Sequence, residues 1–306
     1  MRQFLIRRFV FAIIMLLITT AFVFGLSRAA GDPRYLYLSE YTTMAEWEQW
    51  GEKMGLNRPL IVQYADWLWH ALRLDFGQSL VHKRDAFELI VERGPASLKL
   101  AGASFFFAMI TAIPLGVLSA TRRGTVFDYV GRTLALLGQA MPGFWLGIVL
   151  IMIFSVNINW FPTGRQENGL MSYVLPALTL GWGPLAGMLR LVRSSMLEVL
   201  EAEFVKLARA KGVSTNVVIW KHVFRNALIT PLTYGSLLLA GLLTGAVVVE
   251  TVFAWPGLGR LGVQAVNAND FPLMVAIVLM TGVVFVAANL LVDILYAVID
   301  PRIRYE

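Results

Sequence analysis

Long apolar stretches alternate along the chain with polar segments of very unequal length. The apolar stretches cover residues 9–27, 98–119, 133–155, 173–189, 227–252 and 273–298. Each is close to the ~20 residues that a helix needs to cross the hydrocarbon core of a bilayer. The pattern therefore predicts an all-α membrane protein with six transmembrane helices. Pro114 and Pro184 fall inside two of these stretches, where the neighbouring helices of a bundle can accommodate them.

The distribution of basic residues predicts the orientation in the membrane. Four polar segments, 1–8, 120–132, 190–226 and 299–306, alternate with three others, 28–97, 156–172 and 253–272. The first set carries the basic clusters that short cytoplasmic segments typically hold, including Arg2, Arg7, Arg8, Arg122, Arg123, Arg132, Arg302 and Arg304. We therefore expect both termini in the cytoplasm and the second set outside. The first apolar stretch is longer than the core of a typical signal peptide, and we interpret it as an uncleaved anchor.

The long outer segment, residues 28–97, has helical signals and predicts an extracytoplasmic helical subdomain. Thr43 to Glu46 has the spacing of a capping box, Pro59 suits a helix start, and Asp85 to Glu88 repeats the capping pattern. Tryptophan and leucine then recur at helical spacing after residue 59. This aromatic stripe is typical of packing or of the membrane interface, and docking of a partner is the alternative.

The cytoplasmic segment 190–226, called the basic loop below, is the longest of the predicted cytoplasmic segments and is rich in charge. Glu203 to Lys211 predicts a short amphipathic helix with Phe204, Leu207 and Ala208 on one face. Gly212 follows where a left-handed residue ends a helix, and Ser214 is placed to cap a second helix. The pattern predicts a rigid basic surface, while a loop that only fixes topology is the simpler alternative.

Breaks and acids inside the apolar stretches are candidates for a transport pathway. The third stretch contains Met141-Pro142-Gly143, and freed carbonyls at such a break often face water, although a packing kink is an equal alternative. Acids within a membrane suggest function, but near the ends of spans structural hydrogen bonding is the favoured alternative. Glu250 is expected either to pair with Arg260 or to cap a neighbouring helix. The candidate pathway residues are Gln139, Met141, Pro142, Glu250 and Asp293.

Composition supports a membrane protein without its own catalytic chemistry. Apolar residues make up 57% of the chain and charged residues 15%, and there is no cysteine. The sequence contains no G-x-x-x-x-G-K-[ST] phosphate loop, and its three histidines, at 70, 82 and 222, are expected on two sides of the membrane. We therefore expect no enzyme activity, cofactor or metal site. The net charge of +6 fits membrane orientation better than nucleic-acid binding.

Several motifs resemble those of one family of transport proteins. Ala208 to Gly212 and Arg225 to Leu228 read ARAKG and RNAL, which is similar to the coupling (EAA) loop of permeases of binding-protein-dependent ABC importers. The similarity is to the dipeptide, oligopeptide and nickel branch, although Lys206 stands where the general motif has an acid. Further matches to the same branch follow in the expected order along nearly the whole chain: 31–33, 55–60, 75–80, 256–260 and 300–304.

This resemblance implies a subunit of the prokaryotic inner membrane that forms the translocation pathway for peptides. The implied partners are membrane lipid, a homologous second permease in a heterodimer, two ABC ATPase subunits and an extracytoplasmic solute-binding protein. The residues expected to contact the ATPase are Glu203, Phe204, Leu207, Ala208, Arg209, Lys211, Gly212 and Val213. Nickel chelates, glutathione or oligosaccharides are alternative cargoes. An ion-coupled transporter or channel and a membrane scaffold are alternatives from other classes.

Overall fold

The computed structural model describes residues 2–29, 31–32, 34–38, 41–166 and 168–299 of the 306-residue chain. Within its helices, the side chains at 2–5, 36–37, 239–240, 243–245 and 293–299 are outside the description. The described part is built from helices and turns, and its one bridge of β type pairs Gln78 with Asp85. The predicted all-α class is confirmed for these residues.

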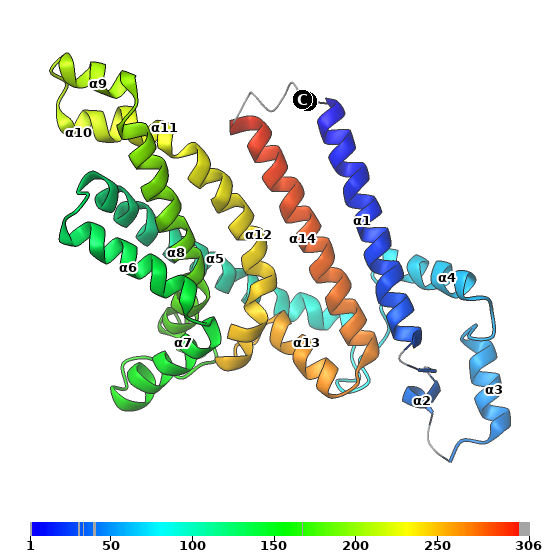
Figure 1. Ribbon diagram of the computed structural model, residues 1–306. Coiled ribbons are helices and arrows are strands. Elements are labelled where there is room, and N and C mark those ends of the chain that lie inside the picture. The colour runs from blue at the N-terminus through cyan, green and yellow to red at the C-terminus, as the bar shows by residue number, and fades with distance from the viewer. Residues whose placement is uncertain (1, 30, 33, 39–40, 167, 300–306) are drawn as a thin grey trace. The chain divides into compact units, whose positions relative to one another are not determined.

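The helices follow one another along the chain as Figure 1 shows. Their bounds are α1 Arg2–Ala29, α2 Arg34–Tyr37, α3 Met44–Lys53, α4 Leu60–Leu72, α5 Ala86–Thr121, α6 Val126–Ala140, α7 Gly143–Leu150, α8 Met171–Leu200, α9 Glu203–Ala210, α10 Thr215–Val217, α11 Arg225–Ala227, α12 Ile229–Val252, α13 Leu258–Asn267 and α14 Phe271–Ile299. Two π-helical segments, η1 Ile151–Asn157 and η2 Val218–Phe224, continue α7 and α10.

Three of the apolar helical segments differ in extent or shape from the predicted apolar stretches. α5 is one continuous helix from Ala86, so it includes the end of the segment 28–97 as well as the second apolar stretch, and α8 continues to Leu200, past the start of the basic loop. The third predicted span is bent by 106° between α6 and α7. Among the described residues four helices are long and apolar enough to cross a membrane, or five if the bent pair counts as one span. Pro142 stands at this bend with an extended backbone, as the N-cap residue of α7, where its missing N–H costs no helical hydrogen bond.

The described residues form two compact units, which are considered separately. One contains residues 2–93 and 261–290, and the other contains residues 94–260 and 291–299. In the second unit α5, α6 and α8 share a core with α9, η2 and α11, centred on the fully buried Leu189, Met188 and Val205. Close helix packing there requires small residues. A side chain at Gly116 would stand 2.8 Å from the Cβ of Val192.

The first unit joins α1 to the outer segment through aromatic packing. Phe24 of α1 lies 5.5 Å from the Tyr64 ring and 5.7 Å from the Trp67 ring of α4, measured between ring centroids. Thr20 and Tyr64 also share a hydrogen bond of 2.8 Å between their hydroxyls. The predicted capping box is confirmed, since Thr43 and Glu46 bond each other's backbone amides at the start of α3. Part of the aromatic stripe therefore packs on α1, as the simpler interpretation expected.

Also within the first unit, the buried carboxylate of Asp270 joins the loop after α4 to the start of α14. Asp270 is 1% exposed and accepts from the Ser79 hydroxyl and from the backbone N–H groups of Leu80 (3.1 Å), Val81 (3.3 Å) and Leu273 (3.4 Å). A carboxylate has room for about four such donors. Asp270 thus caps α14 and fixes a turn about 190 residues away in sequence.

We expect Asp270→Ala to release this turn. The buried Ser79 hydroxyl and the part-buried amides of Leu80 and Val81 would lose their acceptor, and leaving a buried donor unpaired costs about 1–3 kcal/mol. Hydrogen exchange of the 79–83 peptide should accelerate by about tenfold or more in the purified protein. Asp75→Ala is the matched control, since the Asp75 carboxylate accepts from the exposed amide of Gly77. Equal exchange in both variants would contradict the assignment.

Candidate functional site

The basic loop contains a short helix that ends as the sequence predicts. α9 covers Glu203–Ala210, and Gly212 has a φ of +76°, in the left-handed region. The Val213 N–H donates to the Ala208 carbonyl at 3.2 Å, and the Gly212 N–H donates to the Arg209 carbonyl at 3.0 Å. This pair of bonds is the Schellman motif, which satisfies carbonyls left free at a helix end. The reversal of the chain at Gly212 is therefore fixed by backbone geometry.

The two faces of α9 differ from the prediction. Val205 is fully buried and Ala208 is 9% exposed, whereas Phe204 and Leu207 are 45% and 57% exposed. Phe204, Leu207 and Ala208 thus do not share one packed face. The helix uses Val205 and Ala208 to pack on its own protein, and the larger apolar residues at i and i+3 point away. The sequence pattern alone does not show which apolar stripe meets the protein core.

Charged side chains accompany this exposed apolar pair. Glu203, Arg209 and Lys211 are exposed, and Lys206 donates to Glu203 at 2.8 Å. Lys221 and Arg225 are exposed on the segment that follows. α9 and the segment after it therefore expose two large apolar groups together with mainly positive charges. Such a combination of apolar and charged groups is typical of protein interfaces.

The second helix of the loop begins at the predicted residue but without the predicted bond. Ser214 occupies the N-cap position of α10, and no capping hydrogen bond of its side chain is found among the described residues. The helix continues through η2 and α11, where Asn226 donates to the His222 carbonyl at 2.6 Å and Ala227 is buried in the core. Within the RNAL motif, Ala227 therefore contributes packing and Asn226 bonds within its own helix.

A buried ionic network lies where the end of α8 meets the start of α6, next to the basic loop in sequence. Asp128 is 1% exposed and accepts from Arg193 Nε at 2.8 Å and from Arg132 Nη2 at 3.1 Å. The Ser119 hydroxyl and the Gly124 N–H complete its shell, each at 3.0 Å. A buried ion pair is tolerated when its remaining hydrogen bonds are satisfied, as they are here. The network ties the ends of α5, α6 and α8 together.

Sequence reasoning did not identify Asp128 or Arg193 as a pair. The available signal was that Asp128 is the only acid in the predicted cytoplasmic segment 120–132, which also carries Arg122, Arg123 and Arg132. A lone acid among arginines is a candidate for ion pairing. Which arginine it meets depends on helix packing. In the structure it bonds Arg193, which is 65 residues away, and its own-helix neighbour Arg132.

The candidate pathway residues at the α6–α7 break lie on an exposed face. Gln139 and Pro142 are exposed and Met141 is half-buried. Gln139 accepts from Arg190 of α8 at 3.3 Å, between Oε1 and Nη1. Pro142 is the N-cap residue of α7, so the backbone turns sharply at the predicted position. The polar pair of Gln139 and Arg190 therefore lies next to the break.

Glu250 is fully buried, and its carboxylate holds the start of another helix. It accepts from the Ser97 hydroxyl at 2.5 Å and from the backbone N–H of Arg260 at 3.1 Å, while the Leu258 N–H donates to Ser97 at 2.8 Å. Of the two predicted roles, the structure supports capping. The Arg260 guanidinium bonds the Ala254 carbonyl instead of the acid. A side chain at Gly257 would overlap this carboxylate, which explains the glycine.

The second predicted intramembrane acid cannot be placed in the same way. Asp293 belongs to α14, but its side chain lies outside the described residues. Asn289, one turn before it, donates to the Phe285 carbonyl at 2.9 Å within the same helix. The candidate pathway set is thus split among the exposed break at 139–142, the buried Glu250 and an undescribed side chain.

Comparison with known proteins places the chain in a family of transport proteins. Residues 1–101 match the family described as "Binding-prot-dependent transport system membrane comp, N-term", and residues 112–305 match "Binding-protein-dependent transport system inner membrane component". The oligopeptide transport system permease protein AppB of Bacillus subtilis (strain 168) is 41% identical over 316 residues. The glutathione transport system permease protein GsiC of Salmonella typhimurium (strain LT2) is 39% identical over 307. Both alignments cover 100% of each chain.

Solved structures share the fold at much lower sequence identity. A chain from the MetNI methionine ABC transporter in inward-facing conformations is 19% identical and superposes with a TM-score of 0.58, covering 69% of this chain and 96% of that one. A chain from an amino acid ABC transporter with histidines is 13% identical, with a TM-score of 0.56, and covers 69% of this chain and 94% of its own. The shared fold agrees with the family found by sequence.

We expect removal of the buried charge at position 128 to destabilise the protein. Asp128→Asn leaves Arg193, only 20% exposed, without its anion, and the loss should be ~2–3 kcal/mol after allowance for this partial exposure. The double variant Asp128→Asn/Arg193→Gln should recover part of the loss, which a double-mutant cycle of thermal unfolding measures. Glu201→Gln is the control, since it removes only the exposed 3.9 Å pair with Arg123. Strict additivity of the two single changes would show that no coupling exists.

Proposed function

The chain belongs to the family of binding-protein-dependent transport system inner membrane components, and from this premise we propose that it forms half of a peptide translocation pathway. It is an ABC importer permease of the inner membrane. The peptide cargo is supported by its similarity to AppB, an oligopeptide permease, along the whole chain. Glutathione, which is itself a small peptide, is the second candidate because GsiC is nearly as similar.

The proposed topology has six spans with both termini in the cytoplasm. α1, α5, α8 and α14 provide four spans, the bent α6–α7 pair a fifth and the 24-residue α12 the sixth. The outer segment 28–97 then lies outside the cell membrane, on the side of the solute-binding protein. The basic loop lies in the cytoplasm, on the side of the ATPase. In this orientation the basic clusters lie inside, as the positive-inside rule requires.

The observation that carries the proposal is the two-faced packing of α9. Val205 and Ala208 anchor the helix in the core that also contains α5, α6 and α8, so a displacement of α9 moves this core with it. Phe204 and Leu207 remain exposed to fill a groove of another protein. The Schellman turn at Gly212 keeps the helix from swinging freely. The basic loop thus has both the anchor and the contact surface that force transmission needs.

The mechanism assigns ATP chemistry to partner subunits. No phosphate-binding P-loop occurs in this sequence, so two ABC ATPase subunits hydrolyse ATP and press on α9 of this chain and of a homologous permease. The Asp128–Arg193 network passes the movement from the end of α8 to α6. α6 ends at the break around Met141 and Pro142, where we place the contact with cargo. A solute-binding protein delivers the cargo from outside.

Truncation of the exposed pair on α9 should weaken assembly. Phe204→Ser/Leu207→Ser removes two large apolar groups from the contact, and such anchors contribute about 2 kcal/mol or more each. Co-purification of the ATPase with the permease should fall at least tenfold. Thermal unfolding of the permease should change little, because both side chains are about half exposed.

Met44→Ser is the control for this measurement. Met44 is 75% exposed on α3, outside the basic loop. Full recovery of the ATPase with the double variant would place the contact elsewhere on the chain.

Substitutions at Gly212 test transport itself. In proteoliposomes that contain both permeases, the ATPases and the binding protein, the wild type should accumulate labelled peptide only with ATP. Gly212→Val should abolish this uptake, because a β-branched residue is strained at a positive φ. Gly212→Asn should retain most of it, because asparagine tolerates this conformation and open space surrounds the position. If valine and asparagine transport equally, the turn is not part of the mechanism.

A further inference from the structure

An open apolar groove lies between α1 and the start of α4, within the first unit. Ala21, Phe24, Gly25, Arg28 and Ala29 form one side, and Leu60, Ile61 and Tyr64 form the other. The groove has a volume of about 550 Å3, which is in the usual range of small-ligand pockets, ~300–1,000 Å3. A side chain at Gly25 would meet no atom within 4 Å, so nothing in the described structure fills this part of the groove.

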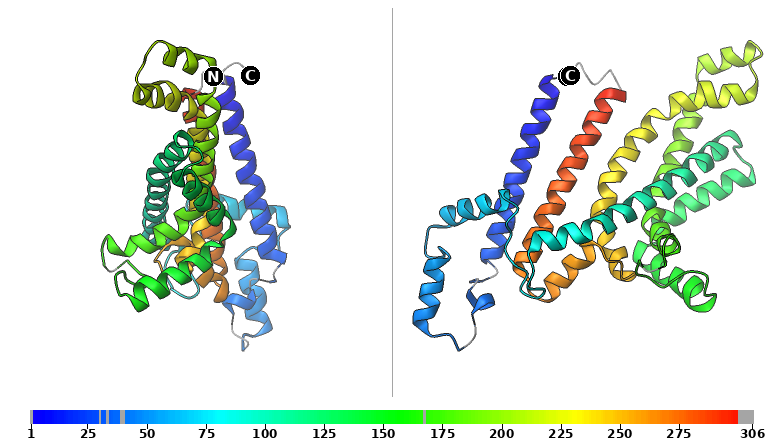
Figure 2. Two further views of the ribbon diagram at one scale, coloured as in Figure 1. Left: turned by 60° about the vertical axis from the view of Figure 1, so that its left-hand side comes forward. Right: turned by 180° about the vertical axis from the view of Figure 1, so that it is seen from behind.

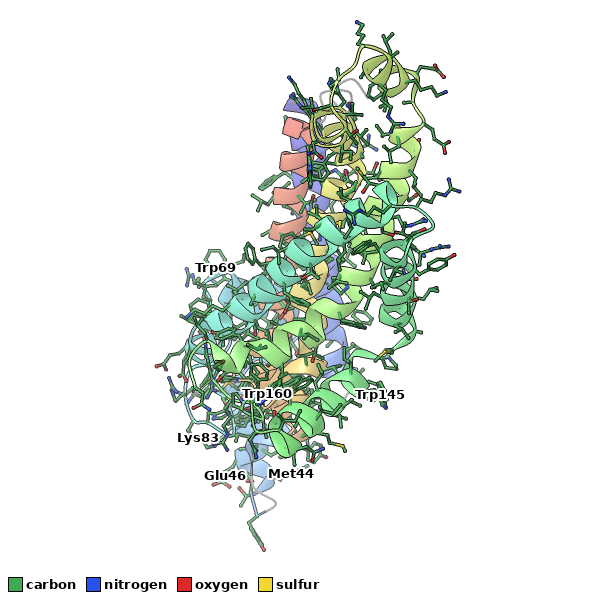
Figure 3. All side chains as sticks on the ribbon, turned by 90° about the vertical axis from the view of Figure 1, so that its left-hand side faces the viewer. Met44, Glu46, Trp69, Lys83, Trp145 and Trp160 are labelled. Atoms are coloured by element: carbon green, nitrogen blue, oxygen red, sulfur yellow. The ribbon has the colours of Figure 1, made fainter. Side chains whose placement is uncertain are left out.

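The two helices that form the groove are suited to the surface of a membrane. α1 is a candidate span with very little of its surface buried, and α4 runs across α1 near its C-terminal end rather than along it (Figures 1 and 2). α4 exposes Ile61 at 82% and Leu72 at 70%, and Trp69 projects away from the ribbon (Figure 3). A helix with large exposed apolar groups and tryptophan is typical of the bilayer interface.

One cation stands in this apolar groove. Arg28 is half-buried, its guanidinium lies 5.1 Å from the centroid of the Phe24 ring, and its Nε is buried without a hydrogen-bond acceptor among the described residues. The nearby Asp32 is engaged with Arg34, through a contact of 3.5 Å and a backbone bond of 2.9 Å. Asp32 therefore acts on the Arg28 guanidinium only through its charge, and no described acceptor meets the buried Nε–H. A phosphate diester supplies both an anion and hydrogen-bond acceptors for such a group.

We propose that this groove binds one phospholipid with an anionic headgroup. Its phosphate bonds Arg28, and an acyl chain follows α1 back past Gly25 and Ala21. Charge and shape favour a lipid over a helix of the second permease, since an apolar helix would bury the guanidinium without an acceptor. The bound lipid would hold α4 against α1 and thereby fix the outer segment. The proposal concerns lipid binding rather than transport, and it does not depend on which cargo the protein carries.

Native mass spectrometry of the intact transporter complex tests the proposal. The probes are phosphatidylglycerol and phosphatidylcholine with identical acyl chains. We expect the wild type to retain phosphatidylglycerol about fivefold better, the equivalent of ~1 kcal/mol for one basic residue at a membrane surface. Arg28→Gln should remove this preference and Arg28→Lys should keep part of it. Gly25→Leu should fill the groove and reduce binding of both lipids at this site.

Two controls separate this site from general lipid binding. Arg73→Gln removes an exposed cation beside Trp69 at the end of α4 and should keep the wild-type preference. Because the chain has no cysteine, Gly25→Cys also provides a single probe inside the groove. An unchanged preference in Arg28→Gln, unchanged binding in Gly25→Leu, or efficient short-range cross-linking of Gly25→Cys to the second permease would each overturn the proposal.

Discussion

A polar group that is buried in a protein must find its hydrogen-bond partner within the chain, and this constraint shapes several helix ends of this protein. Helix starts leave free N–H groups, and inside a membrane protein another part of the chain must accept them. Glu250 and Asp270 do this at the starts of α13 and α14, and each also binds the hydroxyl of a serine that is distant in sequence. Asp128 instead accepts from the Gly124 N–H before α6, from the Ser119 hydroxyl and from Arg193 of α8. Each acid therefore joins parts of the chain that are distant in sequence.

This arrangement gives the basic loop a firm base. α9 is short, and a helix of this length is unstable on its own in water. Its stability comes from Val205 and Ala208 in the shared core and from the backbone bonds at Gly212. The Asp128 network braces the neighbouring ends of α6 and α8. A partner that binds Phe204 and Leu207 would therefore push on a helix that is rigidly packed and hydrogen-bonded to the rest of the protein. Such rigidity is a condition for transmitting movement from the partner to the other helices.

The outer segment is held by different interactions, mainly aromatic ones. Tyr64 and Trp67 pack on Phe24, and a hydroxyl bond joins Thr20 to Tyr64. The far end of the segment is held differently, by the bonds of Ser79, Leu80 and Val81 to Asp270. Aromatic packing leaves the adjoining groove apolar and open, apart from Arg28. The same contacts that attach α4 to α1 therefore create a site with the chemistry of a lipid headgroup and chain.

Local sequence patterns were sufficient to predict the helical class, the break at Pro142, the capping box at Thr43 and the helix–glycine turn at Gly212. These features depend on local patterns, since hydrophobic length, proline and glycine act within a few residues. Only the tertiary structure decided that Val205 rather than Phe204 faces the core, that Asp128 pairs with Arg193, and that Glu250 caps a helix. These outcomes depend on contacts between segments 65 or 153 residues apart, and on helix rotations that one sequence does not specify.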